Sequence, residues 1–419
     1  MRNRYLLILL TLVFSFNFAT SQENNKSNIR DAAIKVFLDC YRCDVDYIRR
    51  EIPYVNYVRD RKEADVHIMV TTESTGSGGV EYQINYLGAR KYEGIKDQVK
   101  YISNPDDTRD VIREGKTKMM ALGLMQFVSK TPLANKIKIS YDNNGHDEAE
   151  EEVVKDKWNS WVFDTDMSFD YDQQETYINP EVEADFQVEK ITPDWKIEFA
   201  TGYDYTLRKY IYEDTVYQSK RNRSSLSHLL VKSLNDHWSV GGRVYLSSDT
   251  YRNHRFAWSI YPAVEYNVFP YYESSRKQFR FQYRVGYGYK FYDEPTIYDK
   301  TEEGLFGQQL SVAYELLQPW GSINTSLSGF SYLHDFSKNN VQLRSWVYIR
   351  LFKGLSLNLS GRAQFIRDQI SLPKSDATAE EVLLQQRQVA TQYSYNLKVG
   401  FSYTFGSIYN NVVNPRFGD

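Results

Sequence analysis

The sequence predicts a small α/β domain followed by an all-β antiparallel transmembrane β-barrel of about twelve strands. Three observations lead to this fold class. Apolar and polar residues alternate repeatedly over the C-terminal two thirds of the chain. The region before it mixes strand signals with helix signals, and the N-terminus has the features of an export signal.

The clearest alternation covers residues 279–291. Successive side chains of a β-strand point to opposite faces, so this segment makes one apolar face and one polar, cationic face. A soluble core does not accept three charges in one strand, whereas a membrane barrel needs a lipid-facing side and a polar interior. The apolar face consists of Phe279, Phe281, Tyr283, Val285, Tyr287, Tyr289 and Phe291, and the charges between them are Arg280, Arg284 and Lys290.

Similar alternation recurs in seven or more runs, each about as long as a tilted strand that crosses a bilayer, and about twelve strands are predicted from Trp158 onward. An even number of strands returns both ends of a single-chain barrel to one side of the membrane. Short turns are expected at the periplasmic end, at 191–194, 234–237 and 352–354, and longer polar connections at the outer surface, at 214–224, 294–303 and 371–386. The predicted strands lie near 158–172, 177–190, 194–209, 217–233, 236–249, 254–269, 276–292, 303–317, 320–334, 340–352, 354–368 and 389–405.

The composition favours this interpretation and disfavours one class of partner. The 419 residues carry a formal net charge of -3, which argues against nucleic acid as a partner. The mean hydropathy of -0.58 is expected of a barrel, because alternating strands average to neutrality. The chain contains 35 tyrosines, and aromatic side chains form girdles at membrane interfaces. The alternative is a tyrosine-rich soluble β-sandwich, which the charged strands disfavour.

Residues 1–21 have the features of a signal peptide. Arg2 and Arg4 form a basic start, residues 5–18 are apolar, and Ala19 and Ser21 supply small residues before a cleavage point. The apolar run is short for a membrane span, so an uncleaved anchor is the weaker alternative. Export together with barrel strands predicts the cell outer membrane, with the N-terminal domain in the periplasm.

Five segments follow from these patterns. We expect a signal peptide at 1–21, a flexible segment at 22–30, a periplasmic α/β domain at 31–141, an acidic linker at 142–157 and an outer-membrane β-barrel at 158–419. The linker is rich in Asp, Asn and Glu, but its spacing does not fit a calcium-binding EF-hand loop, so a solvated linker is the better interpretation.

The α/β domain is expected to contain five strands and two helices. The strands are predicted at 34–38, 54–58, 64–71, 80–87 and 137–141, and the helices at 44–52 and 107–128, with Asp44 as the N-cap of the first helix. The longer helix is expected to bury Val111, Ile112, Met119, Leu122, Met125 and Phe127.

Cys40 and Cys43 are separated by two residues and lie between the first strand and the first helix. This spacing is typical of a thiol–disulfide exchange site, but an exported compartment also favours a simple local disulfide. No proline precedes the 64–71 strand, where a thioredoxin-like site has its cis-proline, and no histidine lies nearby to complete a zinc site. A structural disulfide is therefore preferred over redox activity, reduced thiols or a metal site.

The charges on the predicted inner face of the barrel separate into two walls. They either pair across a narrow interior or line a water-filled pore whose transverse field orients zwitterions or ions. The acidic wall consists of Asp164, Asp166, Asp170, Glu181, Glu183, Asp185, Glu189, Glu198 and Asp204. The cationic wall consists of Arg243, Arg280, Arg284, Lys290, Arg344, Arg350 and Arg362.

Residues 63–70, residues 78–88 and the helix from Asp107 resemble the amino-terminal α/β domain of TolB. They share its order of an alanine-aspartate strand, a glycine hairpin, a second strand, a polar link and a long helix. The resemblance covers about a quarter of the chain and implies protein–protein contacts in the periplasm, with no catalytic residue carried over. The whole chain, including its 403–417 segment, also resembles Bacteroidetes-type outer-membrane proteins that join such a domain to a barrel.

These features together predict a non-enzymatic pore or transport barrel whose periplasmic domain gates the lumen or binds a partner. The alternative is a structural or envelope-assembly protein in which the barrel anchors a partner-binding domain. A barrel hydrolase is third, because Ser227 and His228 are adjacent on one strand and face opposite ways. No cofactor motif and no metal-ligand set is recognised. The expected partners are outer-membrane lipid, a periplasmic protein and small polar solutes or ions.

Overall fold

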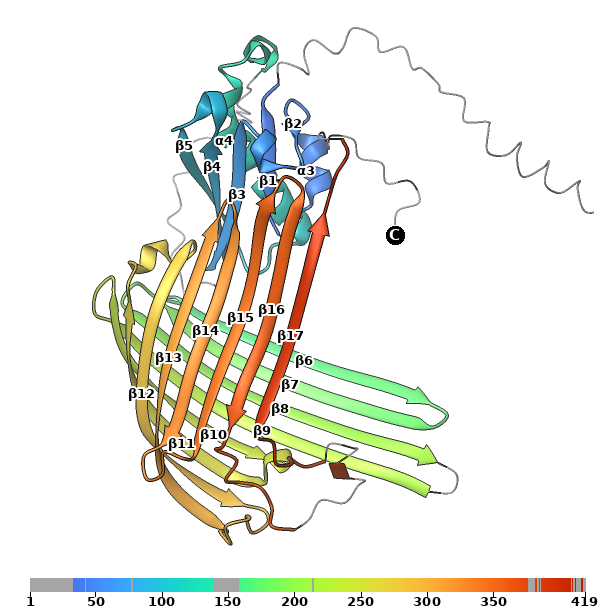
Figure 1. Ribbon diagram of the computed structural model, residues 1–419, viewed down its shortest axis with the longest axis vertical. Helices are drawn as coiled ribbons and strands as arrows, with labels where there is room; N and C mark the ends of the chain where they lie inside the picture. Colours follow the sequence, from blue (N-terminus) through green and yellow to red (C-terminus); the bar gives the residue numbers. More distant parts are fainter. Residues whose placement is uncertain are drawn as a thin grey trace, which may run out of the picture.

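The computed structural model describes two sheets, a small mixed sheet of five strands and a large antiparallel sheet of twelve strands (Figure 1). It describes residues 33–138 apart from 42 and 77, residues 158–375 apart from 213 and 214, residues 386–407, and residues 381, 382, 384, 409, 411 and 416. The predicted signal peptide, the segment 22–30 and the acidic linker 142–157 lie outside the described residues.

The small sheet has the strand order β2-β1-β3-β4-β5, in which β1 is parallel to both of its neighbours and the remaining pairs are antiparallel. Its elements are β1 (Lys35–Asp39), α3 (Val45–Glu51), β2 (Asn56–Tyr57), η1 (Arg61–Glu63), β3 (Val66–Ser74), β4 (Val80–Gly88), η2 (Arg90–Tyr92), β5 (Lys96–Ser103), α4 (Arg109–Val128) and η3 (Pro132–Lys136). The predicted cap of α3 is confirmed, because the Asp44 carboxylate accepts a hydrogen bond from Tyr47 N at 2.9 Å.

Strand β5 corrects the sequence analysis, which expected only a polar link between the second glycine-hairpin strand and the long helix. It lies at the edge of the sheet, where Lys96, Asp97 and Lys100 remain in solvent while Val99 packs against the core, so its apolar signal is weak. The strand expected at 137–141 is also wrong where it is described: Ile137 and Lys138 belong to no strand, and 139–141 lie outside the described residues.

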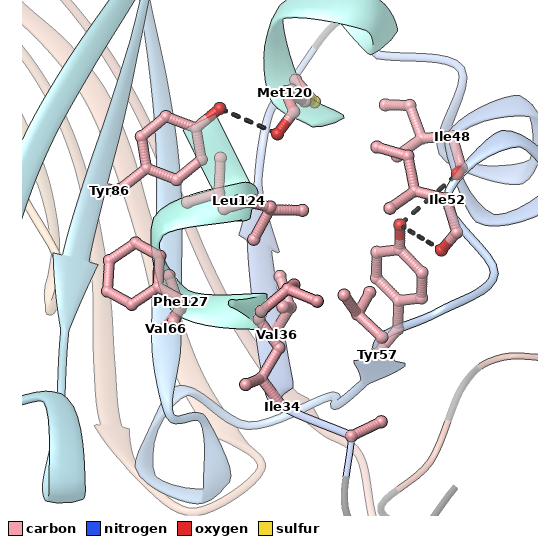
Figure 2. Close-up of a cluster of buried hydrophobic side chains, with 14 of the residues drawn as sticks. Ile34, Val36, Ile48, Ile52, Tyr57, Val66, Tyr86, Met120, Leu124 and Phe127 are labelled. Carbon is pink, nitrogen blue, oxygen red and sulfur yellow. Dashed lines mark hydrogen bonds between the residues drawn. The ribbon is translucent and has the colours of Figure 1, made fainter. Parts of the chain in front are cut away.

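Helix α4 packs against the small sheet and closes its hydrophobic core (Figure 2). The Tyr86 side chain of β4 is fully buried there, and its hydroxyl donates to Met120 O at 3.0 Å and to Met119 O at 3.1 Å. Gly123 permits this close approach, because a Cβ at that position would lie 2.3 Å from the Tyr86 ring. The contact fixes the helix over the sheet.

The predicted apolar face of this helix is partly wrong. Val111 and Leu122 are 48% and 53% exposed, whereas Met120, Leu124 and Phe127 are completely buried. Residues three, four and seven positions apart share one helical face, and the buried stripe runs from Lys116 to Val128. The predicted set mixed this stripe with residues from the solvent side.

The large sheet confirms the prediction of twelve antiparallel strands. Each strand pairs with the next one along the chain, and β6 and β17 are its two edges, with no pairing between them among the described residues. The strands are β6 (Trp161–Gln174), β7 (Tyr177–Ile191), β8 (Trp195–Tyr212), β9 (Thr215–Ser233), β10 (Trp238–Asp249), β11 (His254–Asn267), β12 (Lys277–Tyr292), β13 (Glu302–Gln318), β14 (Gly321–Tyr332), β15 (Asn339–Phe352), β16 (Leu355–Ile366) and β17 (Tyr393–Tyr403). Short helices η4 (Thr250–Arg252) and η5 (Tyr271–Glu273) lie in two of the connections.

The sheet curls, so that β6–β9 pass behind β13–β17 in Figure 1. One face is apolar from β10 to β17, because partner residues in adjacent strands share a face. A continuous row of such partners runs through Trp238, Tyr266, Phe281, Val312, Leu327, Leu343, Ala363 and Tyr395. The alternation read from the sequence is therefore in register from strand to strand.

One predicted connection is wrong. Residues 214–224 were expected to form a long polar loop, but residues from Thr215 onward belong to β9 and pair with β8 up to Tyr212. Both strands of this hairpin continue beyond their apolar segments, and their backbone hydrogen bonds do not require apolar side chains. The short turns expected at 191–194, 234–237 and 352–354 all lie between strands, as does the connection around 294–301.

Candidate functional site

The face opposite the apolar row is polar, and the pairing registers place the predicted lumen charges on it. Glu198 of β8 lies opposite Leu229, which lies opposite Arg243, which in turn lies opposite Tyr261. The same register places the charges of β12 and β15 on this face, here called the polar face. The two predicted walls are therefore regions of one continuous surface.

The acidic region covers β6, β7 and β8. Asp166 lies directly opposite Asp185, and Glu183 directly opposite Asp204. Like charges in directly opposite positions repel. Asp164, Asp166, Glu183 and Asp185 have no ion-pair partner within the described part of the chain. These four carboxylates therefore keep their negative charge unpaired, although Arg243 of β10 lies 4.0 Å from Glu198 in the same region.

The cations of β8, β10 and β12 surround a cavity of about 450 Å³ on the polar face. Its lining includes Lys196, Arg243, Arg280 and Arg284, and we call it the cationic cavity. These residues come from three strands, and only the pairing of β8 through β12 brings them together.

The carboxylates near this cavity form only long ion pairs with its cations, among them Lys196 Nζ at 3.9 Å from Glu198 Oε2. Arg280 Nε lies 3.8 Å from Glu265 Oε2, and Arg243 Nη2 lies 4.0 Å from Glu198 Oε1. Glu265 instead accepts hydrogen bonds from two neutral donors, Gln282 Nε2 at 3.0 Å and the Tyr271 hydroxyl at 3.2 Å. The cavity therefore keeps an excess of positive charge.

The small domain is joined to the large sheet by an ion pair at the end of β1. Arg350 of β15 binds Asp39 with both terminal nitrogens, Nη1 to Oδ2 at 2.8 Å and Nη2 to Oδ1 at 2.9 Å. Arg350 Nη1 also donates to Pro319 O at 2.9 Å. Paired hydrogen bonds between a guanidinium and a carboxylate are among the strong polar contacts in proteins.

The surroundings of Asp39 keep it ionised. Burial alone raises the pKa of this carboxyl, but the contacts with His67 and Arg350 outweigh burial and hold the pKa below its ordinary value of 3.8. His67 Nε2 lies 3.4 Å from Asp39 Oδ2, and its ring packs edge-on against Phe37. The charged pair therefore persists at neutral pH.

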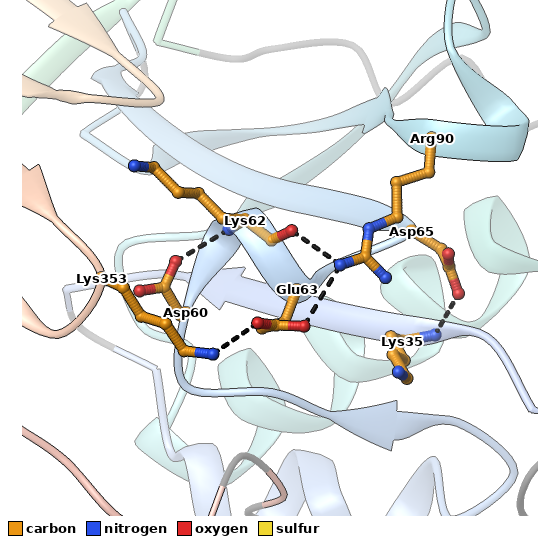
Figure 3. A network of polar contacts seen from close by, with 7 residues as sticks. All are labelled: Lys35, Asp60, Lys62, Glu63, Asp65, Arg90 and Lys353. Carbon is orange, nitrogen blue, oxygen red and sulfur yellow. Dashed lines mark hydrogen bonds and ion pairs between the residues drawn. The ribbon is translucent and has the colours of Figure 1, made fainter.

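A second group of contacts surrounds η1 (Figure 3). Glu63 lies 2.5 Å from Lys353 Nζ through Oε1 and accepts from Arg90 Nη2 at 3.2 Å through Oε2. Asp60 Oδ2 accepts from Gly354 N at 2.9 Å. The hydrogen bond from Lys353 lowers the pKa of Glu63, and Gly354 has a φ of +74° that suits the turn between β15 and β16.

Other turns at the same end of the sheet also touch the small domain. The connection between β11 and β12 contributes Ser274, whose hydroxyl donates to Glu73 Oε1 at 2.8 Å. Beyond β17, Tyr409 forms an antiparallel bridge with Val58, and the Asn411 side chain accepts from Tyr57 N at 2.6 Å. The small domain is thus docked across the short-turn end of the sheet (Figure 1).

The opposite end carries a different set of contacts. The connection from β16 to β17 folds against neighbouring loops, where Asn253 Nδ2 donates to Ser371 O at 3.0 Å and Ile297 N donates to Leu372 O at 2.9 Å. The Ser371 hydroxyl lies 2.9 Å from His254 Nε2, but it is only 8% exposed. Sequence spacing gave no signal for this Ser–His contact, and burial shields the hydroxyl from a substrate.

The two cysteines form a disulfide bond, with their Cα atoms 5.5 Å apart. The bond follows β1 directly, beside Asp39. No cluster of metal-ligating side chains is present among the residues that the structure describes. No helix in the same residues has the length and apolar character needed to cross a membrane.

No protein-family model and no curated protein matches the chain. The assignment of function therefore depends on the geometry of the polar face and of the docked domain.

Proposed function

We propose that the chain is an outer-membrane β-barrel pore whose periplasmic α/β domain gates it. The even number of antiparallel strands, the apolar face and the polar, charged face all support this proposal. The resemblance of the small domain to that of TolB, and of the whole chain to Bacteroidetes-type outer-membrane proteins, is part of the same proposal.

Closure of the barrel would join β6 to β17. The chain enters the sheet in β6 and leaves it in β17, and strands of odd and even order run in opposite directions, so the two edges meet antiparallel. Both edges carry strongly exposed apolar residues, including Met167 at 80% and Tyr395 at 75%. Pairing would satisfy the backbone groups of both edges, which a bilayer requires, and would make the apolar face continuous.

The bidentate pair between Asp39 and Arg350 is the observation that carries the gating proposal. Arg350 belongs to the polar face, and Asp39 belongs to the small domain, so the pair holds that domain over the end of the polar interior. Further contacts at Glu63 and Asp60 bind the same domain to the turn between β15 and β16. The docked arrangement is the closed state in this proposal, and release of these contacts opens the pore.

Single-channel conductance of the full-length protein in planar bilayers tests the proposal. We expect rare openings of the wild type and frequent openings of Arg350→Ala. A charge swap, Asp39→Arg with Arg350→Asp, restores an ion pair of opposite orientation and should return the channel toward the wild-type pattern. Heat-modifiable migration on gels reports, for each variant, that the barrel is folded.

A covalent lock gives the opposite perturbation. Glu63→Cys and Lys353→Cys can be bridged with a bismaleimide, because the two native cysteines are already in a disulfide. The bridged protein should remain closed, while the unbridged double variant opens. Stable insertion without conductance in the wild type, in Arg350→Ala and in the unbridged variant would refute the pore.

The anchor function is the second candidate, and one observation favours it. The outer edge of β5 is unpaired among the described residues, and Ile102 on this strand is 56% exposed. An open strand edge is a common surface for a partner that adds a strand. A folded but silent protein that captures a periplasmic partner through β5 would favour this function over the pore.

A further inference from the structure

The cationic cavity has more positive charge than the structure neutralises. Four cations line it, Lys196, Arg243, Arg280 and Arg284, against Glu265 in the lining and Glu198 beside it. The excess is two positive charges at neutral pH. Lys196, Arg243 and Arg280 are 48%, 42% and 37% exposed, so the cavity is open to solvent and its positive potential attracts an anion.

The orientation of the arginines adds to the charge argument. Arg284 Nη2 donates to the neutral Gln309 Oε1 at 2.5 Å, while Arg284 Nε is buried without a hydrogen-bond partner among the described residues. The guanidinium groups of Arg243 and Arg280 approach no carboxylate oxygen in the described residues more closely than 4.0 Å and 3.8 Å. Guanidinium groups are suited to paired hydrogen bonds with carboxylate or phosphate oxygens.

The dimensions and walls of the cavity indicate a small organic ligand. Its volume of about 450 Å³ lies within the range of small-molecule sites, and its lining includes the apolar side chains of Leu229, Val231 and Ala263. The Tyr261 ring provides a flat wall, with the Arg284 guanidinium 5.4 Å from its centroid. A ligand with an anionic group and an uncharged body would contact both the arginines and the apolar side chains of this cavity.

We propose that the cationic cavity binds a small organic dianion, a phosphate monoester or a dicarboxylate, through Arg243, Arg280 and Arg284. The proposal rests on the proposed pore function, since it names the class of solute that the pore takes. Two negative charges on the ligand balance the excess of two positive charges in the cavity.

A second cavity of about 470 Å³ continues from the first along the polar face. Arg284 and Tyr261 line both cavities, and the second also includes Lys290. Arg280, Arg284 and Lys290 lie on the same side of β12, so a rise of about 3.4 Å per residue spaces them along the strand. A dianion leaving the first site meets Arg284 and then Lys290, and the second cavity is lined by three cations, with Arg252, against the single carboxylate of Asp368.

Isothermal titration of the detergent-solubilised full-length protein tests the site directly. The probes are glucose 6-phosphate and succinate as dianions, with glucose as the neutral counterpart. We expect both dianions to bind, with affinity that falls as salt concentration rises, and glucose to show no binding. Equal binding of glucose, or salt-independent binding, would overturn the proposal.

Variants of the lining residues provide the second arm of the test. Arg284→Gln and Arg243→Gln should each weaken dianion binding about tenfold or more, and Arg284→Lys should lose less because it keeps the charge. Arg362→Gln is the matched control, because it removes a cation from the same face but outside the cavity. The dianion affinity of this variant should stay within about twofold of the wild-type value. Wild-type affinity in both lining variants, with folding verified by heat-modifiable migration, would show that the dianion binds elsewhere.

Binding and conductance measurements test the dianion site and the pore separately. Dianion binding that depends on Arg284, without any conductance, retains the site and refutes the pore. Conductance without dianion binding refutes the site and retains the pore.

Discussion

Removing Arg350 is the sharpest test of domain docking. Its guanidinium makes two charge-assisted hydrogen bonds to Asp39, at 2.8 and 2.9 Å, and the two side chains are 19% and 23% exposed. A hydrogen bond to a charged group contributes about 1.5–3 kcal/mol, and partial exposure to water reduces the sum. We therefore expect Arg350→Ala to weaken docking by about 2 kcal/mol, which is roughly a 30-fold change in the docking equilibrium.

Hydrogen exchange measures this change in the intact protein. The Gly354 amide donates to Asp60 Oδ2 across the same interface, so its exchange requires the small domain to separate from the turn. Exchange of a peptide containing Gly354 should be roughly 30-fold faster in Arg350→Ala than in the wild type. Arg362→Ala, on the same face but away from the domain, is the control and should leave this peptide unchanged.

A double-mutant cycle shows that the change comes from the ion pair itself. Asp39→Ala and Arg350→Ala should each accelerate exchange, and the double variant should be little faster than either single one, because the contact is already lost. Additive effects, with a coupling below about 0.5 kcal/mol, would refute the assignment of docking energy to this pair.

Three further predictions concern docking and the core of the small domain. The pKa values of Asp39 and Glu63 are lowered in the folded protein. Their contribution to docking is therefore complete above the ordinary carboxyl pKa values and is lost as the pH falls through the lowered pKa values. Channel openings should increase below about pH 4, and Arg350→Ala should show a smaller increase. Leu124 is completely buried, so Leu124→Ala should lower the opening free energy of α4 amides by about 3 kcal/mol in hydrogen exchange, and a loss below about 1 kcal/mol would contradict the packing in Figure 2. Gly123→Ala should also destabilise α4, by about 1–3 kcal/mol, because its Cβ would meet the Tyr86 ring at 2.3 Å. An alanine without this contact would instead stabilise the helix by about 1 kcal/mol, so a stabilised α4 would contradict the close packing of Gly123 on Tyr86.

The sequence predicted the large sheet well because its signal is local. Alternation with a period of two marks both the strand and its faces, and the segment 279–291 shows this without any reference to distant residues. Since neighbouring strands follow each other along the chain, the pairing of β6 through β17 needed no crossover between distant strands. The error at 214–224 arose where strand residues are polar on both faces, so that the alternation disappears while the backbone pairing continues.

Prediction was weaker in the small domain, where packing decides. The edge strand β5 carries charge and few apolar residues, and it is a strand because β4 supplies its hydrogen-bond partners. The buried face of α4 is set by the sheet beneath it, which selected Met120 and Leu124 and left Leu122 in solvent. Local apolar content does not distinguish these two sides of the helix.

For the large sheet, the sequence by itself determined most of the strands, which face of each is apolar and how the charges divide between early and late strands, because these properties depend on residues within a few positions of each other. Only the tertiary structure decided which charges meet. Asp39 and Arg350 are 311 positions apart, and Arg243 and Arg284 share a cavity through the register of three strands. Such contacts join residues that are far apart in the chain, and the local spacing of residues contains no direct signal for them.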